Sequence, residues 1–171
     1  MAAQKIKLVA LDVDGVLTNG AICLGNNGEE LKFFHVRDGL GIRMAQETGI
    51  IFAIITGRES EIVRRRAKEL GILEVHQGVH DKWPVLQGLV TKYGLTMDQV
   101  AYVGDDLNDI AIIKSVGLGA TVADGVPEVR KMAVYVSPLK GGHGAVRDIL
   151  ELILKAQDKW DGLVAKFIGE K

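Results

Sequence analysis

The chain has 171 residues, of which 47 % are hydrophobic and 25 % charged, a balance typical of a folded globular protein rather than a disordered one. Its 21 basic and 22 acidic side chains give a formal net charge of −1, which argues against a nucleic-acid or membrane-surface partner. The N-terminus lacks a secretory signal pattern, and no apolar run approaches the roughly 18 residues of a membrane span. We therefore expect a cytoplasmic protein. The single cysteine, Cys23, is expected to be a small packed hydrophobic residue.

Apolar runs of strand length alternate with helical segments of about a dozen residues. Strands are expected at 6–11, 50–55, 73–76, 100–103, 116–122 and 134–136. Helices are expected from Asp38, the expected N-cap, to about 49, and then over 59–70, from 81, over 110–114 and after 144. The tail from 158 to 171 is expected to be a helical extension or a docking arm. This alternation predicts the α/β class, with a doubly wound, Rossmann-like parallel sheet and helices on both of its faces.

An insert separates the first strand from the first helix. Two short β-type runs flank the turn sequence Gly25-Asn26-Asn27-Gly28, which predicts a β-hairpin over about residues 18–37. Four apolar side chains in this stretch make the hairpin a candidate assembly surface: Ile22, Leu24, Phe33 and Phe34.

Two aspartates, Asp12 and Asp14, directly follow the first apolar run, and Gly15 comes next. A buried strand that ends in polar residues delivers them to the carboxyl edge of the sheet, where open α/β sheets bind ligands. Two carboxylates this close repel each other unless a cation or a hydrogen-bond donor compensates them. The pair therefore indicates a divalent metal, although the same spacing also occurs in surface loops and calcium sites.

Two further positions are suited to binding a phosphate. Thr56 ends the run 50–55, and its hydroxyl and the amide of Gly57 could hold a phosphate oxygen; the alternative is a backbone cap. Lys82 lies at the start of a helix, where the helix dipole disfavours a cation, so its placement suggests an anion nearby; the alternative is an ordinary solvated lysine. Lys92 is a weaker candidate because it lies at the far end of that helix.

An acidic loop follows the strand expected at 100–103. Asp105, Asp106, Asn108 and Asp109 place three carboxylates and a carboxamide within five residues, an oxygen-rich set suited to Mg²⁺. The loop lacks the alternating spacing and the distal glutamate of a calcium-binding loop. A solvated acidic turn is the alternative.

These four segments together resemble the motifs of the haloacid dehalogenase superfamily of phosphatases, beginning with the sequence LDVDGVLT. The resemblance implies that Asp12 is the nucleophile and forms an aspartyl-phosphate. It implies that Asp14 protonates the leaving oxygen and later deprotonates the attacking water. Magnesium would be bound by Asp12, Asp105 and the backbone carbonyl of Asp14.

The same resemblance implies roles for the remaining candidates. Thr56, Lys82 and the backbone amides after the nucleophile, including that of Gly15, would hold the phosphoryl oxygens. Asp109 and Asp106 would lie behind the metal ligands and orient metal-bound water or Lys82.

Most phosphatases of this superfamily carry a cap domain over the site. Here the interval 14–56 holds only the hairpin and one helix, and the interval 56–82 holds only a helix and a short strand. We therefore expect residues 1–171 to form one phosphatase domain without a cap. Another subunit would then cover the open site.

Longer stretches, including TNGAI, FHVRDGLGI, ITGRES and GGHGAVRDILELIL, resemble the family of 3-deoxy-D-manno-octulosonate 8-phosphate phosphatases over nearly the whole chain. The resemblance implies a homotetramer that hydrolyses a small phosphorylated sugar acid in lipopolysaccharide biosynthesis. Arg58 follows Thr56 and Gly57, where it could pair with the sugar carboxylate. Arg66 and Arg147 are further basic candidates, and solvated helix faces are their alternative.

Two other functions remain open at this stage. The substrate could be a nine-carbon sialic-acid-type 9-phosphate, although Arg58 resembles the octulosonate type more closely. The chain could also be a noncatalytic domain of this fold that assembles with a sugar-nucleotide synthetase. That role would not require the whole acidic and basic set, and here Asp12, Asp14, Lys82 and Asp105 are all present.

Overall fold

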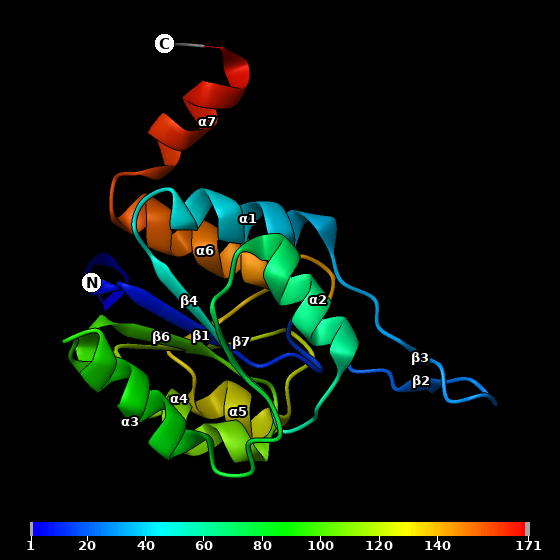
Figure 1. Ribbon diagram of the computed structural model, residues 1–171. Coiled ribbons are helices and arrows are strands. Elements are labelled where there is room, and N and C mark those ends of the chain that lie inside the picture. The colour runs from blue at the N-terminus through cyan, green and yellow to red at the C-terminus, as the bar shows by residue number, and fades with distance from the viewer. Residues whose placement is uncertain (1, 170–171) are drawn as a thin grey trace.

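A six-stranded parallel sheet runs through the centre of the computed structural model, which describes residues 2–169 (Figure 1). The order of the strands is β5-β4-β1-β6-β7-β8. In chain order they are β1 (Leu8–Leu11), β4 (Ile51–Ile55), β5 (Glu74–His76), β6 (Val100–Val103), β7 (Leu118–Thr121) and β8 (Tyr135–Val136). The chain winds outward in one direction through β4 and in the other through β6, so the ends of β1, β4 and β6 meet at the switch point where such sheets bind ligands. The predicted fold class is confirmed.

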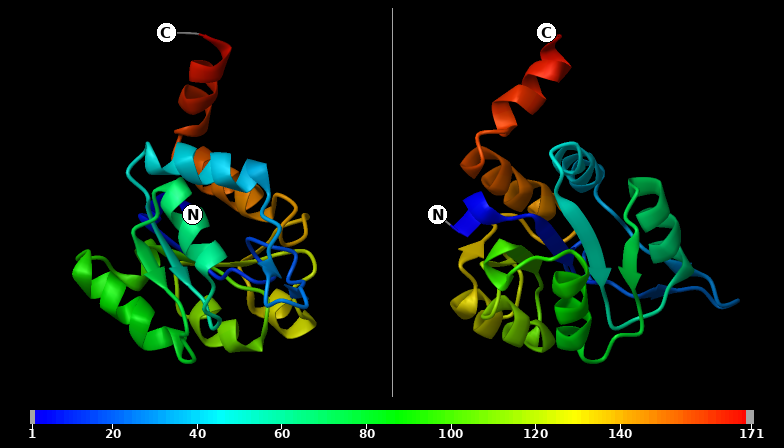
Figure 2. Two further views of the ribbon diagram at one scale, coloured as in Figure 1. Left: turned by 45° about the vertical axis from the view of Figure 1, so that its right-hand side comes forward. Right: turned by 60° about the vertical axis from the view of Figure 1, so that its left-hand side comes forward.

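Helices cover both faces of the sheet (Figures 1 and 2). One face carries α1 (Val36–Gln46), α2 (Glu61–Leu70) and α6 (Ala145–Ala156). The other carries α3 (Lys82–Lys92), α4 (Ile110–Ile113) and α5 (Pro127–Met132). Three short 3₁₀ segments precede strands or helices: η1 (Ala2–Lys5), η2 (Met97–Gln99) and η3 (Leu107–Asp109).

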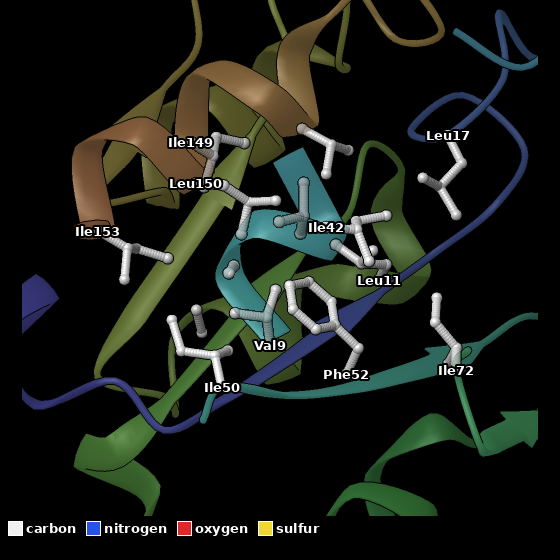
Figure 3. Packing of buried hydrophobic residues seen from close by; sticks show 14 of the residues in the cluster. Val9, Leu11, Leu17, Ile42, Ile50, Phe52, Ile72, Ile149, Leu150 and Ile153 are labelled. Atoms are coloured by element: carbon white, nitrogen blue, oxygen red, sulfur yellow. The ribbon is translucent and has the colours of Figure 1, made fainter. Parts of the chain in front are cut away.

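Strand β1 is buried on both faces, which explains its run of apolar residues without alternation. Val9 and Leu11 point toward α1 and α6, where they pack near Ile42 and Phe52 (Figure 3). Leu8 and the alanine at position 10 belong to the second core, under α3 and α4. Alternate residues of a strand point to opposite faces, so a strand that supplies two cores must be apolar throughout.

The start of α1 differs from the prediction. His35, not Asp38, is the N-cap, and its side chain accepts a hydrogen bond from the backbone N–H of Arg37. Asp38 lies in the first turn and is buried, and it accepts a hydrogen bond of 2.8 Å from the backbone N–H of Arg147 in α6. Asp38 therefore joins two helices instead of capping one. Helix α5, six residues long with Pro127 in its first turn, was not predicted from the sequence.

The two strands of the hairpin are shorter than the apolar runs in the sequence predicted. Strands β2 (Cys23–Leu24) and β3 (Glu30–Leu31) are two residues each, and a bridge between Thr18 and Phe34 closes the base. The tip extends away from the sheet (Figure 1). The prediction that Cys23 is packed is wrong: it is exposed, because this part of the hairpin has no core of its own.

The chain ends in α7 (Trp160–Ile168), which projects from the body of the protein beyond α6 (Figure 2). Of the two alternatives for the tail, the structure shows the helical extension; its last two residues, 170–171, lie outside the described residues. Leu163 is buried, whereas Phe167 and Ile168 are exposed. No helix within residues 2–169 combines the length and apolar character needed to span a membrane.

Candidate active site

The ends of β1, β4 and β6 surround a cavity of about 200 Å³. Asp12 follows β1, Thr56 follows β4 and Asp105 follows β6, so three segments far apart in the sequence contribute to one site. The cavity is lined by Asp12, Asp14, Thr56, Gly57, Arg58, Asp105, Asp106 and Asn108. The structure thus brings most of the predicted site residues together.

Lys82 does not line this cavity but contacts Asp12, which does, and its ammonium group contacts two carboxylates in all. Its Nζ lies 2.7 Å from Asp12 Oδ2 and 2.7 Å from Asp109 Oδ1, and the side chain is 1 % exposed. Burial acts to lower the pKa of Lys82, but Asp12 and Asp109 outweigh it and the pKa lies above its usual value. Lys82 is therefore a fixed cation at the floor of the site.

Asp109 is held by hydrogen bonds on both oxygens. Oδ1 accepts from Lys82 and from the hydroxyl of Tyr102 (2.7 Å), and Oδ2 accepts from the backbone N–H groups of Asp105 (3.0 Å) and Asp106 (3.3 Å). A carboxylate with four donors has little capacity left for another partner. The predicted role of Asp109 was to orient metal-bound water or Lys82, and its 2.7 Å contact with Lys82 is consistent with the second of these.

The carboxylate of Asp105 differs from that of Asp109 in its hydrogen bonding. Among residues 2–169, no side chain or backbone group donates a hydrogen bond to its carboxylate. Burial raises the pKa of Asp105 to about 7, and the nearby charges of Asp12 and Asp109 add to the effect. Oxygen atoms of these three acids lie within 4.8 Å of one another.

The charge balance of this cluster fits a divalent cation. When all three carboxylates are ionised, they face one ammonium group, which leaves an excess of two negative charges. Gly15 has a φ of +87° and approaches Asp105 so closely that a Cβ would lie 2.0 Å from Oδ2, so the backbone after Asp14 also lines this space. Hard oxygen ligands of this kind suit Mg²⁺.

We expect the stabilising effect of Mg²⁺ to increase with pH. The pKa of Asp105 is raised in the folded protein, so in the absence of metal this group favours folding at low pH, and that contribution is lost as the pH rises from about 4 to about 7. Bound Mg²⁺ would take the place of the proton on the carboxyl group of Asp105. The gain in Tm on adding Mg²⁺ should therefore be larger at pH 8 than at pH 5.5. Asp105→Asn should abolish the difference, and an equal gain at both pH values would contradict the expectation.

The three residues that follow β4 all line the cavity. Thr56 is 2 % exposed, and both its backbone groups are used, the N–H to His76 and the carbonyl to Val79. Its side chain and Gly57 line the cavity. Arg58 also lines it. Its side chain is 45 % exposed, and within residues 2–169 its ion-pair contacts are long, 3.7 Å to Asp14 and 3.6 Å to Glu30.

The hairpin reaches the site, which sequence reasoning missed. Lys32 Nζ lies 2.6 Å from Asp14 Oδ1 and 3.4 Å from Glu30 Oε1. Glu30 in turn accepts a hydrogen bond of 2.7 Å from the Ser60 hydroxyl. The alternation of apolar and charged residues from Glu30 to Phe34 was a usable signal, because it places these charges on the face of the hairpin opposite the exposed Leu31.

The three remaining basic candidates, Lys92, Arg66 and Arg147, do not line the cavity. Lys92 pairs with Glu74 at the far end of α3. Arg66 pairs with Glu69 on α2, and Arg147 with Glu151 on α6. Asp106 lines the cavity but also caps the 3₁₀ segment η3, accepting a hydrogen bond from the N–H of Leu107.

The sequence of the chain matches known phosphatases. Residues 67–150 match the model of a haloacid dehalogenase-like hydrolase family. The chain is 48 % identical to the 3-deoxy-D-manno-octulosonate 8-phosphate phosphatase of Salmonella typhi over 159 residues, covering 93 % of this chain and 85 % of that protein.

Solved structures agree with the sequence comparison. A 3-deoxy-D-manno-octulosonate 8-phosphate phosphatase from Moraxella catarrhalis, crystallised with a magnesium ion, a phosphate ion and KDO, has a TM-score of 0.95 and 47 % identity, covering 97 % of this chain and 95 % of that one. The cobalt-bound enzyme from Haemophilus influenzae has a TM-score of 0.90 and 41 % identity, with 93 % of each chain covered. The chain described here belongs to the 3-deoxy-D-manno-octulosonate 8-phosphate phosphatase family of haloacid dehalogenase-like hydrolases.

Proposed function

We propose that the chain is a magnesium-dependent phosphatase that converts 3-deoxy-D-manno-octulosonate 8-phosphate into the free sugar acid and phosphate, a step of lipopolysaccharide biosynthesis. The observation that carries the proposal is the convergence of Asp12 and Asp105 from separate strands, with Lys82 fixed against Asp12. The names of the relatives supply the substrate. Residues 1–171, including the hairpin over about 18–37, would act as one phosphatase domain.

In the first step, a carboxylate oxygen of Asp12 attacks phosphorus and the bond from phosphorus to the sugar oxygen breaks. Asp14 donates a proton to that oxygen, so that the sugar leaves as a neutral alcohol. Thr56, Gly57, the backbone amide of Gly15 and Lys82 hold the phosphoryl oxygens while charge shifts among them.

In the second step, Asp14 takes a proton from a water molecule, and the resulting hydroxide attacks phosphorus. The phosphorus–Asp12 bond breaks, which releases phosphate and restores the carboxylate of Asp12. Asp14 is protonated again and ready for the next substrate. A covalent route of this kind replaces one difficult displacement with two easier ones.

The metal would be held by the carboxylates of Asp12 and Asp105 and by the backbone carbonyl of Asp14. When bound, Mg²⁺ neutralises charge between the carboxylates and the phosphate. Asp109 and Asp106 would orient the groups around it. Since four donors already occupy Asp109, we assign it to support and not to direct ligation.

Arg58 would select the substrate by pairing with the carboxylate of the sugar acid. Its contacts with Asp14 and Glu30 are long, which leaves the guanidinium free to turn toward a ligand.

A panel of phosphosugars with purified protein and Mg²⁺ should show a preference for the octulosonate 8-phosphate over a nine-carbon 9-phosphate. Arg58→Met should raise KM for this substrate by about 10-fold or more and leave KM for glucose 6-phosphate, which has no carboxylate, unchanged. Equal turnover of unrelated esters would refute the substrate assignment.

We also propose that the protein is a cytoplasmic homotetramer. The hairpin supports this, because Leu24 is 68 % and Phe33 63 % exposed, and exposed apolar side chains of this size favour association. Light scattering is expected to give four times the mass of the chain, and Phe33→Asp with Leu24→Asp is expected to lower it. A monomer at working concentration would refute the tetramer.

A further inference from the structure

Lys32 is a buried lysine that the steps above do not use. Its side chain is only 1 % exposed, although it lies just after β3 in a hairpin whose apolar residues Leu31 and Phe33 are largely exposed. Alternation along the strand explains the difference, since Glu30 and Lys32 point toward the body of the protein and Leu31 and Phe33 point away. A buried ammonium group needs partners, and Lys32 finds them in Asp14 and Glu30.

We propose that Lys32 is a positioning residue for the proton transfers of Asp14. Its Nζ lies 2.6 Å from Asp14 Oδ1, which is the shortest contact of that carboxylate among the described residues; Arg58 Nε lies 3.7 Å from Oδ2. The inference rests on the proposed function, because it needs Asp14 to be the acid and base of the reaction. Lys32 acts through Asp14, since it is not among the residues that line the cavity.

The physical reason for such a residue lies in the charges on the other side of the site. Asp12, Asp105 and Asp109 cluster within 4.8 Å, and the ammonium group of Lys82 is committed to Asp12 and Asp109. Asp14 therefore has no cation from the floor of the site. Lys32 supplies one from the opposite side, and a charge-assisted hydrogen bond of this length fixes the orientation of the carboxylate.

A chain of contacts fixes Lys32 itself. Glu30 lies 3.4 Å from Lys32 Nζ, accepts a hydrogen bond of 2.7 Å from the Ser60 hydroxyl and lies 3.6 Å from Arg58. Ser60 precedes α2, only four residues after Thr56. The hairpin is thus attached to the segment that carries the phosphate-binding groups, and the position of Asp14 depends on both.

The leaving group separates a positioning role from a merely structural one. A sugar alcohol is a poor leaving group and needs the proton from Asp14, whereas p-nitrophenolate leaves without one. If Lys32 only held the hairpin in place, its loss would slow the first step by the same factor for both substrates. If it positions Asp14, its loss should slow the first step for the sugar phosphate and not for p-nitrophenyl phosphate. Hydrolysis of the aspartyl-phosphate needs Asp14 as base with either ester, so the comparison has to be made on the first step.

The test compares wild-type protein with Lys32→Met, with Mg²⁺ present. We expect the rate of sugar release in the first turnover of the octulosonate 8-phosphate to fall by about 10- to 100-fold, while the pre-steady-state burst of p-nitrophenol from p-nitrophenyl phosphate stays within about threefold of wild type. Lys32→Arg should recover part of the lost rate. Lys5→Met is the matched control, since Lys5 pairs with Asp98 on an exposed surface, and it should leave both rates unchanged.

A double-variant cycle completes the test. Lys32→Met added to Asp14→Asn should reduce turnover no further than Asp14→Asn alone, because both changes remove the same function. Equal losses in the first-turnover release of the sugar and of p-nitrophenol, or losses of turnover that multiply in the double variant, would overturn the role of Lys32 while leaving the phosphatase intact. Wild-type protein that hydrolyses neither ester would instead refute the proposed function and, with it, this inference.

Discussion

Asp12→Asn is expected to reduce phosphatase activity by at least about 10⁴-fold, because a carboxamide cannot act as the nucleophile that accepts the phosphoryl group. The substitution keeps the shape of the side chain, and its oxygen can still accept the hydrogen bond from Lys82. Steady-state release of phosphate from the octulosonate 8-phosphate measures the effect. Rapid acid quench should trap phosphate bound to wild-type protein but not to the variant.

Asp98→Asn is the matched control for this prediction. Asp98 is an exposed aspartate that pairs with Lys5 on the surface, so its substitution should leave activity within experimental error of wild type. Phosphate release by Asp12→Asn at more than about one tenth of the wild-type rate would refute a covalent role for Asp12.

Lys82→Met should damage both stability and catalysis. The ammonium group neutralises Asp12 and Asp109 in a buried site, and removing one partner of a buried ion pair typically destabilises a protein by about 3–5 kcal/mol. The variant also loses a cation that stabilises charge on the phosphoryl oxygens, which should lower kcat by about 10²–10³-fold. Urea unfolding without metal measures the loss of stability, and steady-state turnover of the octulosonate 8-phosphate measures the fall in kcat.

Lys92→Met provides the comparison on the same helix. Lys92 is 59 % exposed and pairs with Glu74 at the opposite end of α3, so we expect a loss of stability below about 1 kcal/mol and no change in kcat. Similar behaviour of the two lysine variants would contradict the account of Lys82 as the fixed cation of the site.

The sheet and the ends of its strands could be predicted from the sequence. Runs such as 50–55 are apolar without alternation, and polar residues follow them at the edge where parallel strands end. The sequence therefore predicts that Asp12, Thr56 and Asp105 lie together, and all three line one cavity. Order along the chain was sufficient here, because the topology of a doubly wound sheet brings successive strand ends to one edge.

Contacts from the hairpin could not be predicted in the same way. Alternation along the hairpin separates its charged face from its apolar face, but which of the two faces the site depends on where the whole hairpin lies, and that does not follow from local pattern. Lys32 and Glu30 were therefore missed, and Cys23 was wrongly expected to be packed. Asp38 was assigned as a cap because the residue type suits one, yet its partner is Arg147 in α6, more than a hundred residues away.

The central claim is that Asp12 and Asp105 share one divalent cation. A crystal structure of the protein with Mn²⁺ in place of Mg²⁺ tests it directly, since Mn²⁺ can be located by its anomalous scattering. We predict one ion between the two carboxylates, with an oxygen of each at about 2.0–2.3 Å, and loss of that ion in Asp105→Asn crystals grown under the same conditions. An anomalous peak bound to other residues, or none at this edge of the sheet, would contradict the account.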